Sequence, residues 1–160
     1  LVVTGDPPQD MGRKIYPTIS TDVIRKFKME MPEVKVYAGI DQYRTSMRAE
    51  SYSIKRKIQA GADGFFTQPF FDLRFLEIYA ELLEGKDVYW GVSPVLSDKS
   101  VNYWETKNNV VFPKNFEPTL AWNLEFAKDV LSFVKRTDSN IYFMPIRTKL
   151  ADYLAGVLSK

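Results

Sequence analysis

The sequence predicts an α/β protein built from parallel β/α units, and three observations lead to that class. Short apolar runs of strand length alternate with longer segments whose apolar residues recur every three or four positions. Turn signals rich in Gly, Pro and Asp separate these segments. A helix after each strand returns the chain across the sheet, so successive strands should run parallel. With 160 residues and 45% hydrophobic content, the chain is expected to form a single domain over residues 1–160.

Five strands are expected, each from a short run of apolar residues. Valine, isoleucine and aromatic residues, which favour strands, are frequent in these runs. Two prolines after Asp6 exclude both a helix interior and ladder pairing there, so a loop should follow the first run. The expected strands are residues 1–4, 34–40, 63–68, 88–92 and 141–144.

Six helices are expected from apolar residues that recur on one face. Ser20 or Thr21 could cap the first of them and Asp72 the third, because short polar side chains accept hydrogen bonds from free backbone N–H groups. Gly61 and Gly85 follow the second and third, where glycine commonly ends a helix. Residues 93–118 show poor periodicity and predict only a short helix. The expected helices are residues 20–31, 45–60, 72–84, 100–105, 119–136 and 149–158.

Composition excludes several kinds of chemistry. The chain has no Cys and no His, which excludes thiolate nucleophiles, Ser-His relays, disulfides and zinc sites of the usual ligands, and we expect no metal site. The net charge of +2 comes from mixed charges, so we expect no nucleic-acid partner. No apolar run approaches the ~20 residues of a membrane-spanning helix, so we expect no membrane partner. Absence of Cys is compatible with a reducing compartment, and we expect a cytoplasmic location.

Polar residues follow the expected strands and define a candidate site. In parallel α/β proteins the ligand lies against the carboxyl ends of the strands, where loops and helix N-termini converge. The residues at these positions are Asp6, Asp41, Tyr43, Arg44, Thr67, Gln68, Ser93 and Arg147.

Each candidate also has a purely structural interpretation. Asp6 follows a glycine and could bond local backbone groups in a turn. Gln68 could bond a buried loop amide, and Arg147 could pair with a carboxylate. Arg56 and Lys57 could form a solvated helix face. The residues alone leave these alternatives open.

Three motifs resemble the methylenetetrahydrofolate reductase family. They are Gly5-Asp6-Pro7-Pro8, Lys55 to Asp63, and Phe65 to Asp72, and their order and spacing also match. Weaker similarity continues through residues 91–94 to 142–147, so the resemblance covers essentially the whole chain. It implies a TIM-type (β/α)8 barrel, of which this chain supplies about five β/α units. It also implies FAD as the cofactor, which passes hydride to methylenetetrahydrofolate to give 5-methyltetrahydrofolate, with NADH or NADPH as a possible electron donor.

The resemblance also assigns roles to individual residues. Asp6 matches an aspartate beside flavin and folate, where its negative charge should favour the cationic iminium form of the substrate. Gln68 and Arg147 are expected to bind the folate, the glutamine because an amide can both donate to and accept from a pterin edge. Together with Asp6, the expected FAD contacts are Tyr43, Glu50, Ser53, Arg56, Lys57 and Ala62.

The chain also departs from the family pattern. Thr4 stands where the family often has Arg, and residues 39–41 replace an often-found Tyr-Pro-Glu. Eight strands close a barrel and about five are expected here, so we expect a carboxyl-terminal portion of one. It is either a segment of a longer chain, or its missing strands come from a homo-oligomer or another chain. The family's general-acid glutamate belongs to the absent part. Two alternatives remain, a non-catalytic partner subunit and a TIM-barrel aldolase or lyase; the absence of Lys at the end of any expected strand disfavours the latter.

Overall fold

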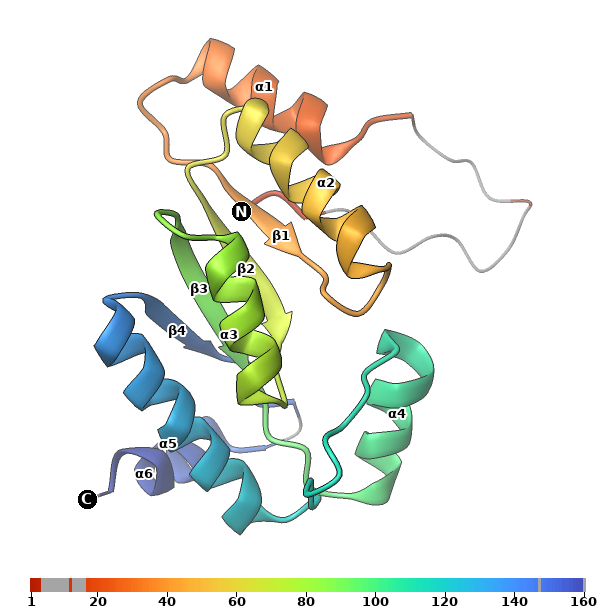
Figure 1. Ribbon diagram of the computed structural model, residues 1–160, viewed down its shortest axis with the longest axis vertical. Helices are drawn as coiled ribbons and strands as arrows, with labels where there is room; N and C mark the ends of the chain where they lie inside the picture. The colour runs from red at the N-terminus through yellow and green to blue at the C-terminus, as the bar shows by residue number, and fades with distance from the viewer. Residues whose placement is uncertain (4–11, 13–16, 147, 160) are drawn as a thin grey trace.

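The computed structural model describes residues 1–3, 12, 17–146 and 148–159, and four strands within them form one parallel sheet (Figure 1). The strands are β1 (Tyr37–Ile40), β2 (Gly64–Pro69), β3 (Asp87–Val92) and β4 (Asn140–Phe143). Each strand pairs with the next one along the chain, in the order β1-β2-β3-β4. The expected α/β class is therefore confirmed, and consecutive parallel pairing is consistent with part of a TIM-type barrel.

Six helices lie in the described part of the chain, and Figure 1 shows α2 and α3 over the same face of the sheet. Helix α1 packs on α2, α3 packs on α5, and α5 packs on α6. Helix α4 lies beyond the arrowhead of β2, at the carboxyl end of the sheet. The helices are α1 (Ser20–Glu30), α2 (Met47–Gln59), α3 (Leu73–Leu82), α4 (Asp98–Asn108), α5 (Leu120–Thr137) and α6 (Leu150–Leu158).

The N-terminal caps of the helices agree with the sequence prediction in one case and differ from it in another. Asp72 caps α3 as expected, because its Oδ1 accepts a hydrogen bond from the backbone N of Phe75 at 2.9 Å. The prediction that Ser20 or Thr21 caps the first helix is wrong. Both residues lie inside α1, with Thr21 buried in its first turn, and the helix follows Ile19 without a side-chain cap. Because Thr21 is buried, its side chain packs in the interior instead of capping the helix.

The face of the sheet beneath the helices forms the main core. Alternate strand residues point to it, as the two-residue period of a strand requires. Trp90 is 2% exposed and its ring contacts Phe70 and Phe133 edge-on. The buried strand residues of this helix-covered face include Ala38, Ile40, Phe65, Val88, Trp90 and Val92, and the helices add Ile54, Leu76, Tyr79 and Val130.

The opposite face of the sheet carries half-buried aromatic residues, and we call it the open face. It is formed by Tyr37, Phe66, Tyr89 and Tyr142, none of which belongs to the helix-covered core. The Phe66 and Tyr89 rings stack with centroids 4.3 Å apart and planes 2° apart. The Tyr37 ring meets both edge-on at 5.7 Å. The rings therefore cover one another instead of packing beneath a helix.

The boundaries of several elements differ from those expected. The strand expected at residues 1–4 is seen, within residues 1–3, as a parallel bridge from Val2 to Ala38 on the outer side of β1. The second expected strand starts at Tyr37 instead of residue 34, and the backbone N of Val36 donates to the Asp63 carboxylate. Helix α4 is longer than the segment expected at 100–105. No helix in the described residues is long and apolar enough to cross a membrane.

Candidate functional site

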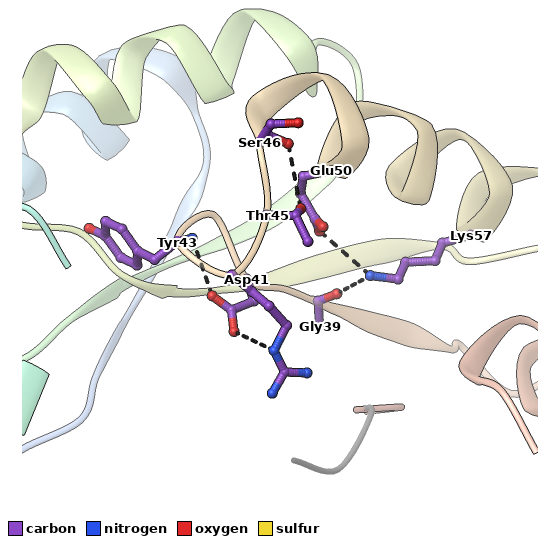
Figure 2. A network of polar contacts seen from close by, with 8 residues as sticks. Gly39, Asp41, Tyr43, Thr45, Ser46, Glu50 and Lys57 are labelled. Carbon is purple, nitrogen blue, oxygen red and sulfur yellow. Dashed lines mark hydrogen bonds and ion pairs between the residues drawn. The ribbon is translucent and has the colours of Figure 1, made fainter. Parts of the chain in front are cut away.

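Three candidate residues lie together at the carboxyl edge of the sheet, while Asp6 and Arg147 lie outside the described residues. Asp41 follows β1, and its carboxylate accepts a hydrogen bond from the backbone N of Tyr43 at 3.2 Å and pairs with Arg44 at 3.6 Å (Figure 2). Ser93 follows β3 and donates to the carbonyl of Met144 at 2.7 Å. The side chains of Asp41 and Ser93 thus stabilise the loops that follow their strands. The half-buried side chain of Gln68 has no hydrogen-bond partner within the described residues and stays available to a ligand.

The backbone around Gln68 is irregular. Strand β2 advances from Phe66 to Pro69 while β3 advances from Tyr89 to Gly91, so β2 contains one extra residue. This is a β-bulge, which bends a strand and redirects its side chains. The hydroxyl of Thr67, inside the bulge, accepts a hydrogen bond from the backbone N of Gly91 at 3.0 Å.

A side chain that follows β1 and another from β4 donate hydrogen bonds to this irregular segment. The amide of Gln42, just after β1, donates to the carbonyls of Gln68 and Pro69 at 2.8 and 3.3 Å. The hydroxyl of Tyr142, in β4, donates to the carbonyl of Thr67. Burial raises the pKa of Tyr142 to about 12, so it remains a donor throughout the physiological range. The bulged strand is consequently anchored from two sides.

Sequence reasoning missed Gln42 and Tyr142. The alternation of Asn140 and Tyr142 with Ile141 and Phe143 could have placed the tyrosine on the open face. Gln42 carried no comparable signal, because it follows a strand in an ordinary turn and its acceptors come 26 and 27 residues later.

A buried ion pair links α2 to β1. The Lys57 Nζ lies 3.7 Å from the Glu50 Oε1 and donates to the carbonyl of Gly39 at 2.7 Å (Figure 2). The two side chains are 12% and 8% exposed. Burial raises the pKa of Glu50 and lowers the pKa of Lys57, since each charge loses water. The seven-residue spacing brings both groups to the same face of the helix.

The other expected FAD contacts are spread over the molecule. Tyr43 packs its ring against Phe75 with centroids 5.9 Å apart, and burial raises its pKa. Ser53 is half-buried and Arg56 exposed, both on α2. Ala62 precedes β2, at the amino end of the strand and away from Gln68. The structure therefore brings Glu50 and Lys57 together, but Ala62 lies toward the opposite end of the sheet.

Consecutive parallel β/α units with ligand-type side chains at the carboxyl edge define an α/β protein of the class that binds ligands at that edge. Comparison with family models narrows this class. The model of the methylenetetrahydrofolate reductase family matches residues 1–130, and the chain belongs to that family. The matched region includes Gln68 and the Glu50–Lys57 pair. Membership indicates an oxidoreductase concerned with folate-related reduction.

Proposed function

We propose that this chain takes part in the flavin-dependent reduction of 5,10-methylenetetrahydrofolate to 5-methyltetrahydrofolate. The family match over residues 1–130 is the observation that carries this proposal. FAD, when bound, supplies the hydride chemistry, with NADH or NADPH as the electron donor. The chain's own residues then have to hold the cofactor and orient the folate.

Two of the expected FAD contacts, Glu50 and Lys57, have polar groups that can form further hydrogen bonds. The Glu50 Oε1 is buried and has no hydrogen-bond partner among the described residues. The Lys57 ammonium has three donors and gives one of them to Gly39. A carboxylate can accept from a ribose hydroxyl and an ammonium can bind a phosphate, so this pair fits FAD. Arg56, exposed on the same helix, and Ser53 would add a second phosphate-binding charge and a hydroxyl.

The remaining expected contacts support the proposal less directly. Tyr43 packs in an aromatic cluster, while Ala62 lies at the amino end of β2. Gln68 has a free amide near the carboxyl edge, as a folate-binding residue requires. The roles of Asp6 in catalysis and of Arg147 in folate binding rest on the resemblance alone.

The proposal includes a complete barrel and a cellular setting. The four-stranded sheet has two edges, one of which carries, among the described residues, only the bridge from Val2 to Ala38, and an eight-stranded barrel would cover both. We propose that a homo-oligomer or a further chain supplies the remaining strands. A cytoplasmic location belongs to the same proposal, because folate reduction requires no oxidising compartment.

The full chain, assembled with the copies or partner that complete the barrel and titrated with FAD, tests this function. We expect binding that quenches flavin fluorescence, and Arg56→Met should weaken it about tenfold, because one charge-assisted phosphate contact is lost. Lys55→Met is the matched control, since Lys55 is exposed one position earlier on the same helix. Failure of the parent chain to bind FAD would contradict the proposal and favour a non-catalytic partner subunit.

Turnover gives the second arm of this test. Asp6→Asn should slow reduction of methylenetetrahydrofolate by bound, reduced FAD much more than it weakens FAD binding, because its charge favours the cationic substrate. Stopped-flow reoxidation of the flavin measures the rate, and the fluorescence titration measures the binding. Equal rates in variant and parent would remove Asp6 from the mechanism.

A further inference from the structure

We propose that Gln42 is a positioning residue for Gln68: its side-chain amide holds the bulged end of β2, from which Gln68 reaches its ligand. The inference rests on the proposed function, in which Gln68 binds folate. Neither the family motifs nor the strand-end pattern pointed to Gln42. The geometry of β2 assigns it this role.

Strand β1 ends before the carbonyls of Gln68 and Pro69. The last ladder pair between β1 and β2 joins Ile40 to Thr67. Beyond it β1 offers no further strand N–H groups to the carbonyls of Gln68 and Pro69. The amide of Gln42 takes their place at 2.8 and 3.3 Å. Because Gln42 is 4% exposed, water has little access to replace this donor.

On its other side, β2 is held by hydrogen bonds from β3 and β4. The bulge leaves the backbone of Thr67 out of register with β3, and Tyr142 and Gly91 anchor the carbonyl and the hydroxyl of this residue. Ladder bonding with β3 resumes where the backbone N of Phe70 donates to the carbonyl of Gly91 at 2.9 Å. Gln68 therefore lies between Thr67 and Phe70, both of which are held by hydrogen bonds. The side-chain amide of Gln42 donates to the carbonyl of Gln68 itself, at 2.8 Å.

The side chain of Gln68 is half-buried. It has no hydrogen-bond partner in the described residues, so its backbone sets its direction. Loss of the Gln42 donor would leave two carbonyls at the strand end without a partner, and the segment would shift to find others. We expect this shift to weaken folate binding, because an amide that reads a pterin edge must be held to within a fraction of an ångström. FAD binding should remain, since most of its expected contacts, among them the Glu50–Lys57 pair and Arg56, lie on α2.

The experiment uses the full chain loaded with FAD and titrated with 5-methyltetrahydrofolate. Gln42→Met keeps the shape of the side chain and removes the donor, and it should raise the Kd for folate about fivefold with the Kd for FAD unchanged. Gln68→Ala should raise the folate Kd by a similar or larger factor. The double variant should bind no more weakly than Gln68→Ala, because Gln42 acts through Gln68.

A second buried amide provides the matched control. Asn123 donates to the carbonyls of Val95 and Thr119 at 2.9 and 2.7 Å, in another loop. Asn123→Leu should lower thermal stability as Gln42→Met does, yet leave the folate Kd unchanged. If Gln42→Met does not fold, Tyr142→Phe removes the other anchor and keeps the ring. It should raise the folate Kd about threefold.

The outcomes separate this inference from the proposed function. Unchanged folate affinity in Gln42→Met, with a loss in Gln68→Ala, overturns the positioning role and leaves the proposed function standing. If Tyr142→Phe is used instead, unchanged folate affinity likewise overturns the positioning role. Additive losses in the double variant also overturn it, because Gln42 would then act elsewhere. Unchanged affinity in Gln68→Ala overturns the positioning role together with the assignment of Gln68 to folate, while FAD binding still tests the family function.

Discussion

The two faces of the sheet are stabilised in different ways. On the helix-covered face, Trp90 is almost fully buried among aliphatic and aromatic side chains. One residue earlier, Tyr89 lies on the open face, where its ring stacks on Phe66 and stays partly exposed. Adjacent residues of one strand thus belong to two environments. The difference shows that burial holds the helices to the sheet, whereas contacts among rings order the open face.

Hydrogen bonds on the open face support this distinction. The Tyr37 hydroxyl donates to the Asp87 carboxylate, and Asn140 donates to the same group at 2.7 Å. The bond to Asp87 raises the pKa of Tyr37 to about 12. Three strands are therefore tied together across this face by polar groups. In the proposed barrel this face would be the interior, and it is already organised before further strands cover it.

The sharpest test of the comparison is a pair of alanine variants in β3. Trp90→Ala should lower the free energy of unfolding by about 3–5 kcal/mol, because it leaves a cavity in a packed core. Tyr89→Ala should lower it by only about 1–2 kcal/mol, since a partly exposed ring is lost. Urea denaturation followed by circular dichroism measures both. Equal losses would show that the open face is packed as tightly as the covered one.

Disruption of the buried Glu50–Lys57 ion pair is expected to give the next largest loss in the free energy of unfolding. Lys57→Met should lower the free energy of unfolding by about 3 kcal/mol near pH 8, because Glu50 keeps its charge in a buried position. Burial raises the pKa of Glu50, and loss of Lys57 should raise it further. A raised pKa favours the folded state at low pH, so the penalty should be small below about pH 4.3, the unfolded pKa, and grow as the pH rises through the folded pKa.

The double variant Glu50→Gln with Lys57→Met provides the control for that prediction. Removing both charges should restore most of the stability lost in Lys57→Met, because no uncompensated charge remains. Urea denaturation near pH 5 and near pH 8 gives the comparison. A loss that is independent of pH and persists in the double variant would point to packing of the lysine stem instead of charge.

The smallest effect is expected at the amino end of the sheet, outside both faces. Asp63 pairs with Lys28 at 2.6 Å and is about one-third exposed. Burial acts to raise the pKa of Asp63, but hydrogen bonds from Lys28 and the backbone N of Val36 outweigh it and lower the pKa. Asp63→Asn should cost less than about 1 kcal/mol at neutral pH.

The pH dependence of this variant has the opposite sign to that of Lys57→Met. A lowered pKa stabilises the folded state above the unfolded value of about 3.9, and the contribution disappears as the pH falls through the folded pKa. The difference in stability between Asp63→Asn and the parent should therefore disappear at acidic pH. Melting temperatures measured from neutral to acidic pH give this difference. A difference that grows at acidic pH would show that the ionised Asp63 carboxylate does not stabilise the fold.

Local patterns predicted the elements, while tertiary contacts determined the details of the site. Asp72 was predictable as a cap because it directly precedes an amphipathic run. The length of α4 was not, since few of its residues are apolar and only Trp104 is buried. Lys57 belongs to a family motif, but its bond to Gly39 depends on how α2 packs on β1. Gln42 was missed because no local pattern reveals partners 26 residues away.

Gly91 sets a limit on how this region can diversify. A Cβ at this position would lie 2.9 Å from the Tyr142 hydroxyl, which would have to shift, and 3.0 Å from the backbone N of Pro69, which is tighter than most Cβ contacts. Even alanine would press on the tyrosine and the proline that border the bulge. A saturation library at residue 91 should therefore return glycine among well-folded clones, and new specificities would have to arise from loops that leave this strand untouched.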